Sequence, residues 1–273
     1  MKFNPAGGLA ETGICILISA IWVMLCFRSA PSLLKLRARN LRLERSRCLA
    51  ILSIGSPIFA VQLAASAMNA VLNNQLRIYG GDLAISVIGI IHSVVLFIAL
   101  PIYGLNQGAQ PIIGYNYGAR QYDRVKRALQ LAILVATAIC VTGFAIVMGF
   151  PRQVIGLFNR QDTELIQLGA RAIRICLFML PIIGFQIVSA NYFQAIGKPK
   201  HAVFLGLSRQ VLLLIPAILI WPYFLGLDGI WLAFPTADFC SSLLTGTWLF
   251  FELRRLHYRN NGAVQQRGRG IRI

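Results

Sequence analysis

Long, almost uninterrupted apolar blocks dominate this sequence. They lie at residues 7–27, 49–76, 82–103, 125–150, 164–193, 202–224 and 229–253. A helix of about 20 apolar residues crosses the roughly 30 Å hydrocarbon core of a bilayer. Because backbone N–H and C=O groups meet no water there, each block must satisfy its own hydrogen bonds, as a helix does. The sequence therefore predicts an all-α integral membrane protein with about seven transmembrane helices.

Basic residues gather on alternate connections between these blocks. The chain carries a net charge of +17, and most of its Lys and Arg residues fall within 28–47, 120–127, 198–200 and 254–272. Connections rich in Lys and Arg remain cytoplasmic. The pattern predicts a multi-pass protein of the cell (inner or plasma) membrane, with its C-terminus cytoplasmic and residues 80–82 outside. Positive charge confined to alternate connections argues against a nucleic-acid partner and predicts membrane lipid as the partner of these basic residues.

Two polar segments flank the apolar core of the chain. The basic stretch 28–48 is either a solvated linker or a helix lying on anionic lipid. Residues 257–273 lack helical periodicity and are predicted to be a disordered basic tail. The opening residues MKFNPAGG do not form a secretory signal peptide.

The usual catalytic and metal-binding patterns are missing from the sequence. The six cysteines form no CxxC pair, the three histidines lie far apart, and no phosphate-binding GxxxxGK[ST] motif occurs. No nucleophile lies in a recognisable pattern with a base. The sequence therefore predicts neither an enzyme nor a metal site, and no cofactor.

Prolines interrupt most of the apolar blocks. They are Pro57, Pro101, Pro181, Pro216 and Pro235. Each removes a backbone hydrogen bond and bends its helix. Helices bent in this way suit a cavity, as in a transporter, better than a rigid anchor.

Polar side chains inside the blocks are costly unless they face protein or water. Gln62, Asn69 and Asn73 fall on one helical face, together with Ser66. The plain reading is interhelical hydrogen bonding, worth about 0.6 kcal/mol per contact; four polar groups on one face favour a water-filled cavity. His92, in the block 82–103, and Gln186, in the block 164–193, are further candidates for the pathway.

Two charged residues lie deep in the last blocks. Asp238 is near the middle of residues 229–253, and Arg209 lies about two turns into 202–224. A lone carboxylate in hydrocarbon takes up a proton or finds a cation, so Asp238 is the leading candidate for a functional charge. Arg209 is expected to stand alone as a structural or gate residue.

One tract carries a family resemblance. The stretch GLNQGAQPIIGYNYGARQYDRVKRAL resembles the end of the eighth helix and the following loop of the multidrug and toxic compound extrusion (MATE) family. The stretch NYFQAIGKPKHAVFLGLSRQVLLLIPAILIWPYFLGLDGIWLAFPTAD resembles the tenth to twelfth helices of that family. The resemblance covers roughly residues 5–256. It implies that residues 49–256 form the six-helix second lobe and that residues 1–27 are the last helix of the first lobe.

The resemblance implies antiport: lipophilic, often cationic compounds leave the cell as Na⁺ or H⁺ enters. It also implies that the helix ends within the glycine- and proline-rich tract, where Gln107, Gln110 and Asn116 would satisfy freed backbone groups at a cytoplasmic gate. Asp238 matches a family position on the twelfth helix. Amides replace the carboxylates that some members place on the seventh and tenth helices, so the coupling ion stays open.

Other readings remain open at this point. A lipid-linked oligosaccharide flippase shares the two-lobe plan, although an amide-rich cavity face favours the drug exporter. A structural subunit without transport activity is the third reading. Because the predicted spans make one lobe and one further helix, we expect a truncated or split transporter that is inactive alone. Its partner would be the missing first lobe or a second copy of the chain.

Overall fold

The computed structural model describes residues 16–25, 44–160 and 162–269. The chain divides into two compact units, Met1–Gly55 and Ser56–Ile273. The first contains a short apolar helix, Ile16–Leu25, which lies inside the predicted leading helix. The predicted lipid-surface helix covers residues 28–48. Of these, residues 28–43 lie outside the described part of the chain.

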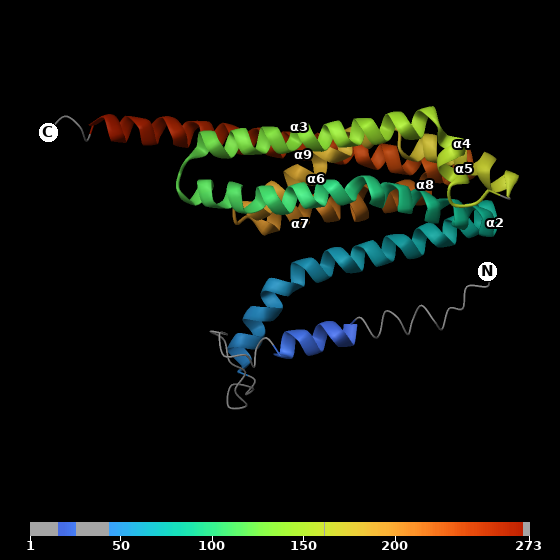
Figure 1. Cartoon of the computed structure of the whole chain (residues 1–273), viewed down its shortest axis with the longest axis horizontal. Coiled ribbons are helices and arrows are strands. Elements are labelled where there is room, and N and C mark those ends of the chain that lie inside the picture. The colour runs from blue at the N-terminus through green and yellow to red at the C-terminus, as the bar shows by residue number, and fades with distance from the viewer. Residues whose placement is uncertain (1–15, 26–43, 161, 270–273) are drawn as a thin grey trace. The chain divides into compact units, whose positions relative to one another are not determined.

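The second unit is built from helices joined by short turns, with no strand in the part that the structure describes (Figure 1). This confirms the predicted all-α fold. In chain order the elements are α2 (Arg45–Gly118, which enters the second unit at Ser56), α3 (Tyr122–Gly149), α4 (Pro151–Gly156), α5 (Thr163–Cys176), α6 (Leu180–Ala195), α7 (Pro199–Leu207), the π-helix η2 (Ser208–Leu214), α8 (Ile215–Leu225) and α9 (Leu227–Arg269).

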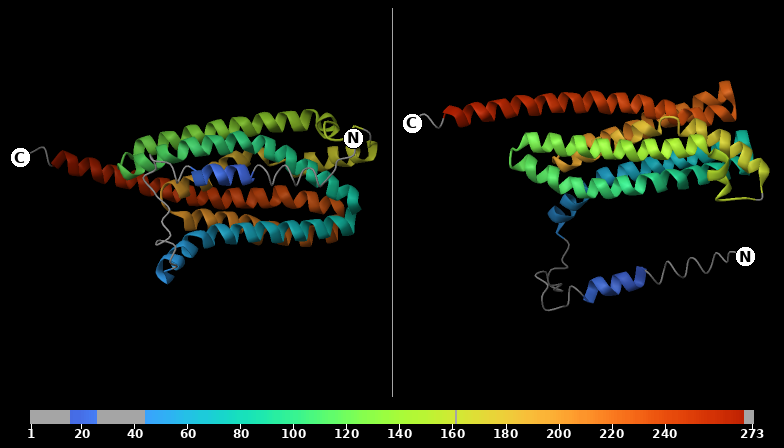
Figure 2. Two further views of the ribbon diagram at one scale, coloured as in Figure 1. Left: turned by 60° about the horizontal axis from the view of Figure 1, so that its bottom comes forward. Right: turned by 45° about the horizontal axis from the view of Figure 1, so that its top comes forward.

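Helix α2 folds back on itself at Gly81. The backbone of this residue has φ 64° and ψ −160°, outside the helical region. A side chain is strained at such a positive φ, whereas glycine is not. The two arms of α2 run in opposite directions from this point (Figures 1 and 2). Gly81 therefore joins two membrane-length helices, as the apolar blocks on either side of residues 80–82 predict.

The second arm of α2 continues to Gly118 and therefore ends within the glycine- and proline-rich tract, as predicted, although only near its far end. It passes through both Pro101 and Pro111. A proline removes only one helical hydrogen bond, and neighbouring helices can stabilise the remaining turns. The side-chain amide of Asn116 donates to the Ile112 carbonyl oxygen at 2.8 Å. It therefore bonds within the last turns of its own helix rather than to the carbonyl that Pro111 frees.

Two other prolines do mark irregular helices. Helices α5 and α6 meet at 54°, and Pro181 lies in the first turn of α6. The π-helix η2 ends where Ile215 donates its N–H to the Gln210 carbonyl, five residues back. Pro216, which has no N–H to donate, follows at once. These two irregularities agree with the bends predicted for residues 164–193 and 202–224.

Length and composition support membrane crossing. Three helices in the described part of the chain are long and apolar enough to span: Phe59–Gly118, Tyr122–Gly149 and Lys200–Leu225. The bent α5–α6 pair gives a fourth, and the first of the three holds both arms of α2. Helix α9 is less apolar because it contains three acidic residues and ends in a polar stretch rich in arginine.

The outer surface of the second unit is apolar. Phe97, Leu134 and Tyr223 are 74%, 65% and 82% exposed. In water such a surface would be an aggregation hazard, whereas lipid tails solvate it well. The chain therefore has an all-α membrane fold.

Helix α9 continues beyond the apolar blocks as far as Arg269. The sequence predicts a disordered tail from residue 257, whereas the structure is helical from there to Arg269. Extending an existing helix by one residue is far easier than nucleating a new one. A polar segment can therefore continue a helix whose packed part lies upstream.

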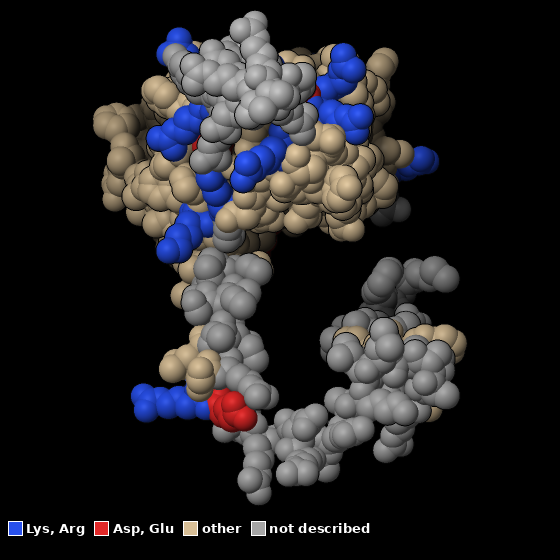
Figure 3. All heavy atoms as spheres, turned by 90° about the vertical axis from the view of Figure 1, so that its left-hand side faces the viewer, with Lys and Arg blue, Asp and Glu red and all other residues tan. Residues whose placement is uncertain are grey.

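Exposed basic residues gather at one end of the second unit. The α2–α3 turn, the α6–α7 turn and the C-terminal half of α9 all lie at this end (Figures 1 and 2). Figure 3 shows it directly, with Lys and Arg side chains spread across the surface. The exposed residues on these elements include Arg120, Arg124, Lys126, Arg127, Lys200, Arg254 and Arg255. The fold thus brings together basic clusters that are distant in the sequence.

Candidate functional site

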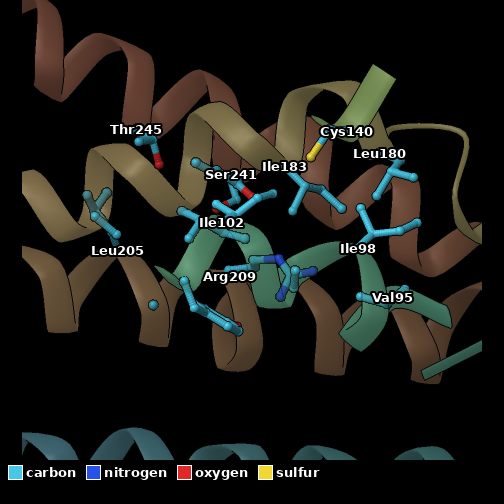
Figure 4. A pocket seen from close by; sticks show the side chains of 16 residues that line it. Val95, Ile98, Ile102, Cys140, Leu180, Ile183, Leu205, Arg209, Ser241 and Thr245 are labelled. Atoms are coloured by element: carbon cyan, nitrogen blue, oxygen red, sulfur yellow. The ribbon is translucent and has the colours of Figure 1, made fainter. Parts of the chain in front are cut away.

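A cavity of about 250 Å³ lies inside the lobe, between the second arm of α2 and helices α3, α6, α7, η2 and α9 (Figure 4). Its walls are mainly aliphatic, from residues such as Ile98, Ile102 and Ile183. Polar groups also line it. They are Tyr103, Gln186, Arg209, Ser241 and Thr245. An apolar cavity with a few convergent polar groups is typical of a ligand site.

A buried ion pair borders this cavity. The Arg209 Nε donates to Asp238 Oδ1 at 2.6 Å, and the two side chains are 33% and 3% exposed. The Gln186 Nε2 donates to the Asp238 backbone carbonyl at 3.3 Å. Asp238 has therefore found a cation, one of the two outcomes expected for it. The expectation that Arg209 stands alone is wrong.

The local backbone explains why Arg209 can reach Asp238. Arg209 lies in η2, whose turns are wider than those of an α-helix. Pro216 removes a regular helical donor just beyond this segment, and the wide turns accommodate that loss. They also change the rotation of the helix at Arg209 relative to a straight α-helix. Such π-turns are frequent at functional sites.

The polar stripe on the first arm of α2 lies away from this cavity. Gln62, Asn69 and Asn73 are all exposed, whereas the core-facing side of the same arm consists of apolar residues such as Met68 and Leu72. The Ser66 hydroxyl donates to the Gln62 carbonyl at 3.1 Å. His92, on the second arm, is exposed as well. The structure thus separates the sequence-predicted pathway residues into an outer stripe and the inner group of Gln186 and Asp238.

The glycine- and proline-rich tract contains a buried amide that sequence reasoning missed. Gln107 and Gln110 are exposed, but Asn106 is only 6% exposed. The Asn106 backbone carbonyl accepts from Asn191 Nδ2 at 3.2 Å, which links α2 to α6. Its helical spacing from the buried residues Ile102 and Ile113 could have shown that it faces inward.

A second ion pair lies near the basic end of the lobe. Lys198 Nζ is 2.6 Å from Glu252 Oε1, and the Glu252 side chain is 7% exposed. Next to it the His201 ring stacks on Phe193, with centroids 5.8 Å apart, and meets Trp248 edge-on. This cluster fastens α6 and α7 to α9. No local pattern in the sequence indicates the pairing, because Lys198 and Glu252 are far apart along the chain.

Helical passages packed around an apolar cavity with a few polar groups are the architecture of a transporter lobe rather than of a single-helix anchor. The MatE family model matches residues 57–219, which is more than half of the chain. The chain belongs to the MATE family. This confirms the resemblance that its sequence motifs suggest.

Individual relatives agree with this assignment. The chain is 24% identical over 227 residues to the multidrug export protein MepA of Staphylococcus saprophyticus, covering 83% of this chain and 49% of the relative. MepA of Staphylococcus aureus strain NCTC 8325 is 25% identical over the same coverage. The chain therefore spans about half the length of the curated relatives it matches.

Solved structures show the same fold. An inward-facing multidrug resistance MATE family transporter of the MOP superfamily has a TM-score of 0.79 and 21% identity, over 89% of this chain and 56% of that one. The MATE multidrug transporter DinF-BH has a TM-score of 0.75 and 37% identity, over 90% of this chain and 55% of that one.

Proposed function

We propose that this chain is part of a secondary antiporter that exports lipophilic, often cationic compounds in exchange for Na⁺ or H⁺. Membership of the MATE family supports transport rather than enzymatic catalysis. The relatives are themselves described as multidrug export proteins or multidrug transporters. The observation that carries the proposal is the exposed amide stripe on α2.

The stripe needs a polar environment. Amides left against lipid lose the hydrogen bonds that they make in water, which costs several kcal/mol. Exposure of Gln62, Asn69 and Asn73 together therefore suits a water-filled space between this lobe and a second one. The second lobe comes from the same longer protein or from another copy of the chain. Substrate crosses along that space, in contact with the stripe.

The buried group serves a different purpose in this proposal. Asp238 and Gln186 lie inside the lobe, where they hold η2 and α6 against α9 through the Arg209 ion pair. Movement of this group during transport would transmit ion binding to the helices around it. The amide tract of Gln107 and Gln110, on the same arm as His92, lines the inner mouth of the pathway. No cofactor is required for such a cycle.

Replacing Gln62, Asn69 and Asn73 together by leucine should reduce export roughly ten- to a thousandfold, because each lost hydrogen bond contributes about 0.5–1.5 kcal/mol. The measurement is efflux of ethidium from a bacterial strain without other multidrug pumps, with the assembled transporter expressed. Thr142→Leu is the matched control, because Thr142 is an exposed polar residue on α3. Normal efflux by the triple variant at wild-type protein level would contradict the proposal.

The basic end of the lobe should face the cytoplasm, since Lys- and Arg-rich connections stay inside. In a cysteine-free background, an impermeant maleimide should label a cysteine at Asp82 in intact cells. A cysteine at Arg124 should react only after the cells are opened. The reverse labelling pattern would invert the proposed orientation, including the cytoplasmic C-terminus in the inner or plasma membrane.

A further inference from the structure

The internal cavity has features that the transport proposal does not use. It lies inside the lobe, whereas the α2 stripe is on the outer surface. Its volume of about 250 Å³ is slightly below the range of roughly 300–1,000 Å³ for drug-sized ligands. Its aliphatic walls suit an apolar body. The cavity is therefore the right size for a small lipophilic molecule.

Arg209 supplies the strongest polar feature of this cavity. Its Nε is engaged by Asp238, but its two terminal nitrogens have no hydrogen-bond partner among the described residues. A third of the side chain is exposed, and Figure 4 shows it among Ile102 and Ser241 at the cavity. A guanidinium has five N–H donors in a planar fork. Most of that donor capacity is thus available to a ligand.

The charges select the ligand class. Arg209 offers the cavity only N–H donors, which the oxygens of a carboxyl group can accept and an ammonium group cannot. Arg209 and Asp238 already cancel one another, so a bare carboxylate would leave an excess buried negative charge, which is costly. The other side chains with a dissociable proton near the pair are Cys140, Cys176 and Tyr103, and none of them is a carboxylate or a cationic group. A carboxylic acid that enters with its proton keeps the group neutral overall.

We propose that the cavity binds a small lipophilic carboxylic acid. The terminal nitrogens of Arg209 hold its carboxyl group, with the hydroxyl groups of Ser241 and Thr245 within the same lining. The acid binds with its own proton on its carboxyl group, so no covalent bond forms or breaks. The site goes beyond the proposed export function, because binding to it requires neither a second lobe nor an ion gradient.

Two probes with the same ring system and opposite charge test the site: 2-naphthoic acid and 2-naphthylmethylamine. Binding is measured by titration calorimetry on the full chain in lipid nanodiscs, with empty nanodiscs subtracted. The acid should bind and the amine should not. Since one proton is taken up with the acid, its affinity should rise from pH 8 to pH 6 by up to about tenfold per pH unit. Equal binding of the two probes, or pH-independent binding of the acid, would overturn the proposal.

Variants of the ion pair should act in opposite directions. Asp238→Asn removes the competing carboxylate, so naphthoate should bind about tenfold more tightly and lose its pH dependence. Arg209→Gln should lower the affinity at least tenfold. A purely structural ion pair would instead make both variants lose binding together, and that result would refute the site.

A third variant tests the site even where Arg209→Gln folds poorly. A Cβ built at Gly206 meets nothing within 4 Å, and Gly206 lines the cavity. Gly206→Leu should therefore fill the cavity without disturbing the ion pair and abolish naphthoate binding. Gly104→Leu is the matched control, because Gly104 also has open space but does not line the cavity. Unchanged binding by Gly206→Leu would place the ligand elsewhere.

Discussion

Replacing Arg209 by methionine should lower the free energy of unfolding by about 3–5 kcal/mol, because it leaves a buried charge without its partner. The Asp238 side chain is only 3% exposed, so water cannot replace the lost guanidinium. The measurement is thermal unfolding of the purified protein in detergent, followed by tryptophan fluorescence, with the variant compared to the wild type at pH 7.

The two partners should not be equivalent. Asp238→Asn leaves Arg209 behind, but that side chain is 33% exposed at the cavity, and the new amide can still accept its hydrogen bond. This variant should therefore cost much less than Arg209→Met. The double variant Arg209→Met with Asp238→Leu should recover most of the stability, since apolar replacements of buried ion pairs are often neutral or stabilising. Equal losses of unfolding free energy in the two single variants would show that the difference in exposure between Arg209 and Asp238 does not determine the cost of breaking the pair.

Gly184→Leu should lower the free energy of unfolding by about 3 kcal/mol or more, at the upper end of the range for overpacked sites. Helices α3 and α6 approach closely here. A Cβ at Gly184 would lie 2.7 Å from the Ala136 carbonyl oxygen and 2.8 Å from its carbon. These are backbone atoms, so the helices must separate to make room. The same thermal unfolding experiment measures the loss, together with the yield of monodisperse protein.

Gly104→Leu is the control for that prediction. It introduces the same side chain on a helix, but nothing lies within 4 Å of the new Cβ. Its unfolding temperature should match that of the wild type. If Gly184→Leu were equally stable, the close approach of α3 and α6 at this point would be refuted.

Several features of the fold follow from the sequence by simple physical rules. The apolar blocks predict membrane helices because hydrocarbon offers no partner for a free peptide group. Gly81 lies between two such blocks, and the chain reverses there. Pro181 and Pro216 accompany irregular helices, as their missing N–H groups predict.

Other features could not be predicted in this way. Gly104, Gly108 and Pro111 do not interrupt α2, which continues through all three to Gly118. Local preferences of this kind amount to only a few kcal/mol, and packing against neighbouring helices can outweigh them. The polar tail is helical for another reason, since α9 continues through it to Arg269 and extending an existing helix is easier than nucleating a new one.

The sequence by itself determined that this chain forms membrane helices, which connections carry the positive charge, and which polar residues share a helical face. These properties depend on neighbours along the chain and on the period of the helix. Only the tertiary structure decided that Arg209 meets Asp238 and that Lys198 meets Glu252. Such pairs depend on how each helix is rotated against the next, which the packing of the whole lobe fixes and no local pattern encodes.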